Sequence, residues 1–206
     1  MAEPIEFYFD FTNPYAYFAS LNVDEIGKRH HRETVWRPVF TSVHAGQDSI
    51  NAADQAQAAQ AAQAAQAEYA IRDIARVARL HRLELNVQHP LVNSLASEIA
   101  YIWLFDQAPR VARNFAEAIF NAHWRLGQNI NDPDIIGDCA AAAGQDPSPV
   151  MASIGAPNAR QRLDAVLKTG LEKGVFSAPT IVVDGEPFCG WDRMAMSEAW
   201  LEHGGW

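Results

Sequence analysis

The first apolar stretch of the chain, Phe7 to Phe11, is rich in aromatic residues and holds a single acid, Asp10. A short apolar run of this kind predicts a buried β-strand. Thr12-Asn13-Pro14 interrupts it, and Pro14 suits the first turn of a helix because proline has no N–H to leave unsatisfied there. Apolar residues then recur at roughly helical spacing, which predicts one helix from Tyr15 to Lys28. The chain therefore opens with a strand, a tight turn and a helix.

The turn itself has two interpretations. Thr12 or Asn13 can serve as an ordinary N-cap, with a side-chain oxygen that accepts from a backbone N–H of the helix. Alternatively, the N–H groups and the positive end of the helix dipole can hold a thiolate, a carboxylate or another anion. The residues of this segment leave both interpretations open.

The pattern after the first helix changes twice. Residues 33–40 predict a second strand, and Pro38 places it at a sheet edge or at a strand end. Residues 41–51 predict a loop. Residues 52–67 consist almost wholly of Ala and Gln, which favour helices, and helical spacing continues to Leu80. We expect a helix over this region, with a flexible low-complexity insert as the alternative.

Helical patterns dominate the middle of the chain. Residues 83–87 predict a short extended piece before His89-Pro90. Helices are predicted over 93–104, 111–124, 134–143, 148–154 and 159–173, with turns at 106–109 and 126–133. These helices are too many to cover a small sheet alone, so we expect residues 51–173 to form an inserted all-helical domain.

The last third of the chain returns to strands. Residues 175–183 are rich in β-branched side chains and predict a strand, and Asp184-Gly185 is a strong signal for a two-residue hairpin turn. Residues 186–189 provide the partner strand, and Gly190 to Arg193 lead into a helix over 194–201. A βαβ opening and a ββα ending predict an α/β fold in which residues 1–50 and 174–206 share one mixed sheet.

Composition and charge narrow the classes of function. The chain has 206 residues, 49% of them apolar, and a net charge of −9, which argues against nucleic acid as a partner. No apolar run is long enough to span a membrane, and no signal peptide is visible. Cys139, Cys189 and the seven histidines match no metal-ligand spacing, so no metal site is expected. Two free thiols fit a cytoplasmic protein.

Five segments, in this order, resemble a known family. They are Phe9 to Tyr17; Tyr69, Asp73 and Arg76; Asn121 to Trp124 with Ile130 to Pro133; Phe176 to Thr180; and Gly190 to Arg193. The chain resembles thioredoxin-fold proteins of the DsbA superfamily that carry a helical insertion. It looks most like the branch that holds 2-hydroxychromene-2-carboxylate isomerases and kappa-class glutathione transferases. The resemblance covers essentially the whole chain.

The resemblance implies a glutathione site at the first turn. The cofactor's sulfur would lie near Asn13, and a cis bond between Ala178 and Pro179 would turn the Ala178 backbone toward the ligand. Asp192 would accept from the γ-glutamyl ammonium and Arg193 would donate to a carboxylate; a helix cap and a surface charge are the alternative roles of this pair. The implied glutathione-binding set is Pro14, Tyr15, Asn51, Ala178, Pro179, Trp191, Asp192 and Arg193. For Trp191 and Tyr15, core or pocket wall is the alternative.

Two positions depart from the family pattern. The family has Ser, or Cys in its oxidoreductases, where this chain has Asn13. An amide N–H₂ can still donate to a thiolate, and Thr12 could supply a hydroxyl if the turn rotates, so Asn13 and Thr12 are the candidate catalytic residues. Gln66 replaces a family Lys, which removes a cation that could bind a carboxylate. No cysteine lies at the turn, which argues against redox chemistry.

Three functions follow from the resemblance. The first is a glutathione-dependent isomerase of an aromatic-degradation or related intermediate, in which the thiol adds to the substrate so that a ring opens and a bond rotates. The second is a kappa-class glutathione transferase-like conjugating enzyme. The third is a non-catalytic binding relative, which Asn13 and Gln66 favour. The family also implies a small-molecule aromatic substrate and a homodimer.

Overall fold

The computed structural model describes residues 2–39, 53–86 and 92–206, apart from the side chains of residues 53–64 and 67. In this part of the chain β1 (Ile5–Phe9), β2 (Thr34–Pro38), β3 (Thr180–Val183) and β4 (Glu186–Cys189) form a sheet of order β2-β1-β3-β4. β1 is parallel to β2 and antiparallel to β3, which is antiparallel to β4. The predicted mixed sheet is confirmed.

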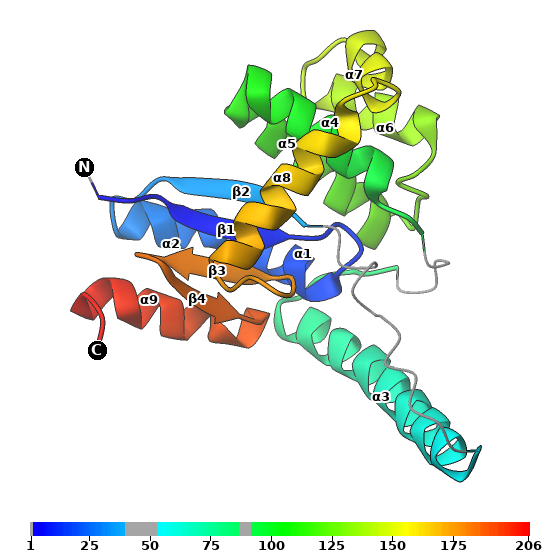
Figure 1. Ribbon diagram of the computed structural model, residues 1–206, viewed down its shortest axis with the longest axis vertical. Helices are drawn as coiled ribbons and strands as arrows, with labels where there is room; N and C mark the ends of the chain where they lie inside the picture. Colours follow the sequence, from blue (N-terminus) through cyan, green and yellow to red (C-terminus); the bar gives the residue numbers. More distant parts are fainter. Residues whose placement is uncertain (1, 40–52, 87–91) are drawn as a thin grey trace.

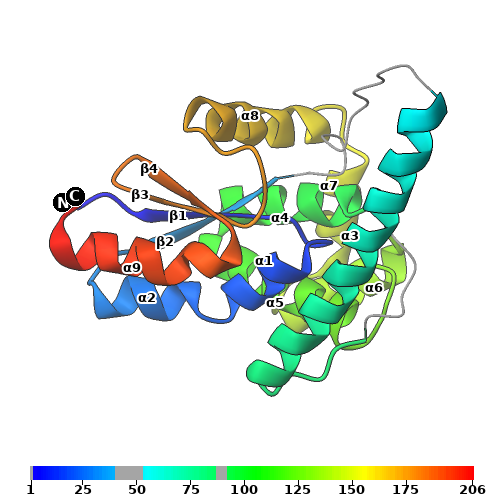
Figure 2. The same cartoon turned by 90° about the horizontal axis from the view of Figure 1, so that it is seen from below.

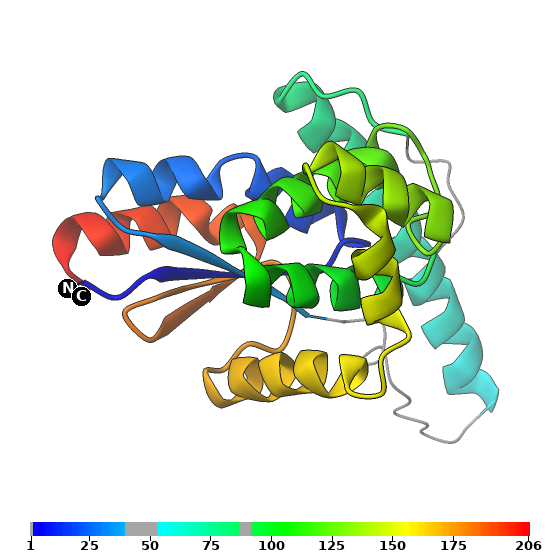
Figure 3. The same ribbon diagram turned by 90° about the horizontal axis from the view of Figure 1, so that it is seen from above.

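Helices cover both faces of this sheet (Figures 1 and 2). α1 (Pro14–Ser20), α2 (Val23–Arg29) and α9 (Met194–His203) lie on one face, and α8 (Ala159–Glu172) lies on the other. The remaining helices gather beyond one end of the sheet (Figure 3): α4 (Leu95–Gln107), α5 (Pro109–Trp124), α6 (Pro133–Ala142) and α7 (Pro147–Ile154). The long α3 (Ala53–Leu80) projects away from this body. The Ala/Gln stretch within it is helical, as predicted.

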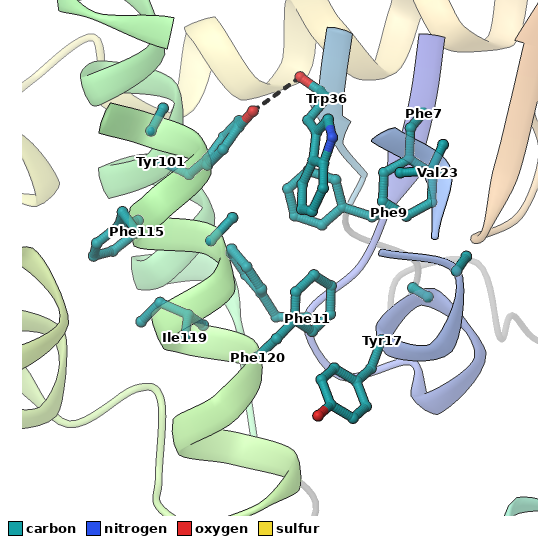
Figure 4. Close-up of a cluster of buried hydrophobic side chains, with 14 of the residues drawn as sticks. Phe7, Phe9, Phe11, Tyr17, Val23, Trp36, Tyr101, Phe115, Ile119 and Phe120 are labelled. Atoms are coloured by element: carbon teal, nitrogen blue, oxygen red, sulfur yellow. Dashed lines mark hydrogen bonds between the residues drawn. The ribbon is translucent and has the colours of Figure 1, made fainter. Parts of the chain in front are cut away.

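An aromatic cluster fixes the end of β1 against the helical unit (Figure 4). The ring centroid of Phe9 lies 5.2 Å from that of Tyr101 on α4 and 5.7 Å from that of Phe120 on α5. Tyr101 Oη donates to Trp36 O over 3.1 Å. Full burial of each such side chain stabilises the fold by roughly 1.5–3 kcal/mol. Phe11 is buried in the same cluster and lies directly before Thr12, so the cluster also holds the start of the turn that follows β1.

A smaller core lies on the opposite face of β1, because neighbouring side chains of a strand point to opposite faces. Tyr8, Val175 and Val182 form it together with Leu167 of α8. A Cβ on Gly170 would lie 3.1 Å from Tyr8 Cε1, so the absence of a side chain there lets α8 approach the sheet. α8 thus contacts β2 as well as α4, although the sequence grouped it with the inserted helices. The two-domain division stays an interpretation.

The structure corrects two predicted elements. The helix expected over 15–28 is two helices, α1 and α2. The backbone carbonyl of Asn22 accepts from Glu25 N and Ile26 N and so begins the second helix. Asn favours such cap positions over helix interiors. The strand expected over 175–183 begins only at Thr180, since Pro179 has no N–H to donate to a ladder. Residues 83–86, expected as a short extended piece, belong to no helix or strand, and Asn86 N donates to Trp124 O at the end of α5.

Two predictions that depend on local backbone preferences are confirmed, one for a strand end and one for a hairpin turn. β2 is an edge strand and Pro38 is its last residue. Asp184 and Gly185 have φ of 51° and 85°, and positive φ at both central residues is what a type I′ hairpin turn requires. None of the described helices combines the length and apolar character that crossing a bilayer requires.

Candidate functional site

Asn13 caps α1 with its own side chain. Asn13 Oδ1 accepts from Tyr15 N over 2.9 Å and from Ala16 N over 3.2 Å. These two N–H groups are among those that the alternative interpretation assigned to a bound anion. In the structure they donate to Asn13, which therefore acts as the N-cap. Pro14 occupies the first helical position, as expected.

The amide nitrogen of the same side chain reaches across to a distant loop. Asn13 Nδ2 donates to Ala178 O over 2.7 Å, and the Ala178–Pro179 bond is cis, as the family resemblance implied. An N–H₂ group has two hydrogens, and this hydrogen bond uses one of them. Asn13 therefore connects the start of α1 to the Pro179 loop and retains one donor.

A cleft of about 420 Å³ lies beside this connection. Four parts of the chain contribute to its walls: α1, α3, the Pro179 loop, and the end of β4 with the 3₁₀ helix η2 (Trp191–Arg193). The lining residues are Tyr15, Asp73, Val77, Ser177, Ala178, Pro179, Cys189, Gly190, Trp191 and Asp192. The structure thus gathers in one cleft five of the residues that the resemblance assigned to glutathione, from segments far apart in the sequence.

Tyr15 forms one wall with a partner from α3. Tyr15 Oη donates to Asp73 Oδ2 over 2.6 Å, and Arg76 pairs with the other oxygen of the same carboxylate. Burial raises the pKa of Tyr15, and the hydrogen bond to Asp73 and its charge raise it further. The Tyr15 hydroxyl is therefore a neutral donor at physiological pH. The sequence analysis did not assign Asp73 to the site, although its spacing from Tyr69 and Arg76 belonged to the family motif.

Trp191 forms the facing wall. Its ring lies edge-on to Phe18 of α1, with centroids 6.2 Å apart, and edge-on to His81 at 5.5 Å. Asp192 follows it on η2 and lines the cleft, with Arg193 Nη1 3.8 Å from its carboxylate. Asp192 is the N-cap residue of neither η2 nor α9, so the capping alternative does not describe it. Arg193 is exposed beside the cleft rather than part of its lining.

Several candidates lie elsewhere. The Thr12 hydroxyl donates to Asp10 Oδ1 over 2.7 Å, away from the cleft. Gln66 is exposed on α3, and Asn51 lies outside the described residues. Cys189, expected only as a free thiol, is half-buried and lines the cleft. The hairpin prediction placed it on a strand but did not indicate which face it would occupy.

The sheet, the helical insertion and the cleft beside the Pro179 loop define a thioredoxin-fold protein with a cleft at the start of α1. The family model of the DSBA-like thioredoxin domain matches residues 4–202. The chain belongs to this family.

Similar proteins include isomerases and disulfide reductases. The chain is 24% identical over 202 residues to 2-hydroxychromene-2-carboxylate isomerase of Sphingobium xenophagum, covering 98% of this chain and 99% of that protein. A solved 2-hydroxychromene-2-carboxylate isomerase superposes with a TM-score of 0.78 at 21% identity, covering 97% and 94% of the two chains. The cytosolic disulfide reductase DsbM of Pseudomonas aeruginosa, solved with GSH, has a TM-score of 0.64 at 10% identity, with 98% of each chain covered.

Proposed function

We propose that this protein is a glutathione-dependent isomerase that acts on a small aromatic substrate with a hydroxychromene carboxylate-like ring. The observation that carries the proposal is the cleft bounded by Tyr15, Ala178 and Asp192, beside a helix start that has an amide in place of a thiol. The similarity to an isomerase over almost the full length of both chains supports the reaction class.

Glutathione has polar groups that suit this cleft. Asp192 would accept from the γ-glutamyl ammonium, in a charge-assisted hydrogen bond. The backbone N–H of Ala178 would donate to the cysteinyl residue, since the Ala178 carbonyl already accepts from Asn13. This arrangement would bring the sulfur to the start of α1, within reach of the second Nδ2 hydrogen of Asn13.

The chemistry would be nucleophilic catalysis by the bound thiol. The thiolate sulfur forms a bond to a ring carbon, the ring C–O bond opens, and the chain rotates about the bond that has become single. The C–S bond then breaks and the thiol is regenerated, so the reaction involves no net oxidation. A donor such as the Asn13 amide would favour the thiolate and thereby lower the barrier to attack.

The cysteine positions favour isomerisation over disulfide exchange. A thiol–disulfide oxidoreductase needs an accessible thiolate at the site of exchange. Cys139 is buried on α6, and burial together with the charge of Asp138 raises its pKa to about 11. Cys189 lines the cleft from the end of β4, but the turn before α1, where the family's oxidoreductases have a Cys, contains no sulfur.

Spectrophotometry with a hydroxychromene carboxylate, with and without glutathione, tests the proposal. We expect a spectral change that depends on added glutathione, and calorimetry that shows glutathione binding. Asn13→Ser, which installs the residue of the family, is the companion variant, and we expect it to retain turnover. Glutathione binding without turnover, or no binding at all, would leave the non-catalytic relative as the better account. Conjugation of a small aryl halide without isomerisation would favour the transferase.

A further inference from the structure

Two carboxyl groups and a hydroxyl are fully buried beneath the α1 turn. Asp10, Ser94 and Glu98 are each 0% exposed. Ser94 Oγ lies 2.9 Å from Glu98 Oε1 and 3.5 Å from Asp10 Oδ1, so the hydroxyl stands between the two acids. The acids come from different units of the fold, since Asp10 follows β1 and Glu98 lies in the first turn of α4. Buried carboxyl groups are rare unless they are paired or functional.

Asp10 holds the turn directly. Its Oδ1 accepts from Thr12 N over 2.8 Å and from Thr12 Oγ1 over 2.7 Å. Its backbone carbonyl accepts from Asn13 N over 3.1 Å. Three hydrogen bonds therefore fix Thr12 and Asn13 to this residue, and two of them are strongest when the Asp10 carboxyl is ionised.

The Ser94 hydroxyl can link the two acids only if Glu98 carries a proton. The Ser94 hydroxyl has one hydrogen and cannot donate to both acids at once. Within the described chain, Glu98 Oε2 has no hydrogen-bond partner, which would leave half of an ionised carboxylate unsatisfied in the core. In a neutral Glu98 the O–H on Oε1 donates to Ser94 Oγ, and the Ser94 hydroxyl can then donate toward Asp10. Oε2 is then an uncharged carbonyl oxygen, whose burial costs less than that of a carboxylate oxygen.

The charges around Glu98 agree with this arrangement. Burial raises the pKa of Glu98, and the neighbouring charge of Asp10 raises it further. The hydrogen bond from Ser94 and the Arg160 guanidinium on α8 act in the opposite direction. Asp10 at the end of β1 and Arg160 on α8 are the charged groups that influence Glu98 from neighbouring elements.

We propose that Glu98 is a positioning residue: a neutral carboxylic acid that completes a proton-ordered chain through Ser94 to Asp10 and so holds Thr12 and Asn13 in the geometry that receives the thiol. This chain of hydrogen bonds makes the turn sensitive to rising pH. When Glu98 loses its proton, the single Ser94 hydrogen lies between two carboxylates, and the hydrogen bonds from Thr12 to Asp10 change in strength. The structural part of this inference stands alone, and its catalytic part rests on the proposed function.

Infrared spectroscopy and amide NMR test the chain without any ligand. We expect a C=O stretch of a neutral carboxyl group at pH 7 that is absent from Glu98→Gln, which keeps a donor toward Ser94. The Thr12 amide of the wild type should shift with pH as Glu98 ionises, and this shift should be absent from Glu98→Gln. No such band at pH 7, or the same Thr12 titration in both proteins, would overturn the proposal.

Glutathione binding then tests the link to function. We expect Glu98→Gln to bind glutathione within about twofold of the wild type, and Ser94→Ala, which breaks the chain while removing one oxygen, to bind about tenfold more weakly. Equal binding by Ser94→Ala and the wild type would overturn the positioning role. If the wild type binds no glutathione, the proposed function fails, and the infrared and Thr12 measurements still decide whether the proton chain exists.

Discussion

Asn13 and Ala178 are joined by a hydrogen bond of 2.7 Å, although 165 positions separate them in the chain. The bond connects two of the four parts of the chain that line the cleft, the start of α1 and the Pro179 loop, and the same Asn13 side chain also caps α1. One amide therefore combines a local role in helix initiation with a long-range role in holding the cleft together. A Ser at this position could cap the helix but is shorter by one heavy atom, so it could not make both contacts in the same way.

Replacement of Asn13 tests this double role. Asn13→Ala should lower the free energy of unfolding by about 1–2 kcal/mol, because it removes a side-chain cap and a partly buried hydrogen bond. The measurement is urea denaturation followed by circular dichroism. Asn22→Ala is the matched control: Asn22 is the N-cap of α2 but makes no side-chain cap bond, so we expect a loss below about 0.5 kcal/mol. Equal losses in the two variants would show that Asn13 contributes only backbone preference.

How much of this molecule the sequence could predict depends on the range of each signal. The sequence predicts the hairpin turn at Asp184-Gly185 and the strand end at Pro38 correctly, because the φ preferences of the turn residues and the missing N–H of proline act locally. The break at Asn22 was missed because the apolar spacing continues across it. Contacts such as Asp10 with Ser94, or Tyr15 with Asp73, depend on how α4 and α3 pack against the turn. Nothing in the spacing of those residues along the sequence indicates a contact, so these parts of the site could be found only in the structure.

The pKa of Tyr15 should respond to its partner on α3. Asp73 raises the pKa of the Tyr15 hydroxyl by accepting its hydrogen bond and by its negative charge. Asp73→Asn removes the charge, so tyrosinate should form at lower pH than in the wild type. The ring signals of Tyr15 in an NMR pH titration would report the change. Asp106→Asn, which removes a carboxylate from an ion pair with Arg162 on another surface, is the control and should leave the Tyr15 titration unchanged. An equal change in the two variants would contradict the hydrogen bond between Tyr15 and Asp73.

Asp192 should contribute to glutathione affinity through charge. Asp192→Asn keeps the shape of the side chain and removes the negative charge that would face the γ-glutamyl ammonium. Because the carboxylate is largely exposed, solvent screens the interaction, and we expect the dissociation constant to rise about threefold to tenfold. Calorimetry at low ionic strength is the measurement. Asp106→Asn, at an exposed ion pair with Arg162 on another surface, should bind like the wild type; a matching loss there would indicate a non-specific charge effect.

Glu98 should make the protein less stable as the pH rises. Its pKa is raised on folding above the ordinary value of 4.5, so the folded state holds the proton over a pH range in which the unfolded state has released it. The derivative of the unfolding free energy with pH is then negative over that range. The stability attributable to Glu98 is fully present below about pH 4.5 and is lost progressively as the pH rises toward the folded pKa.

Denaturation of the wild type and Glu98→Gln over a series of pH values isolates this contribution. Gln has no proton to lose, so the difference in unfolding free energy between the two proteins should shift in favour of Glu98→Gln as the pH rises above 4.5. The other ionisable groups are common to both proteins, so the comparison removes most of their contribution. A difference that does not vary with pH would mean that Glu98 titrates alike in the folded and unfolded states, which would contradict the raised pKa.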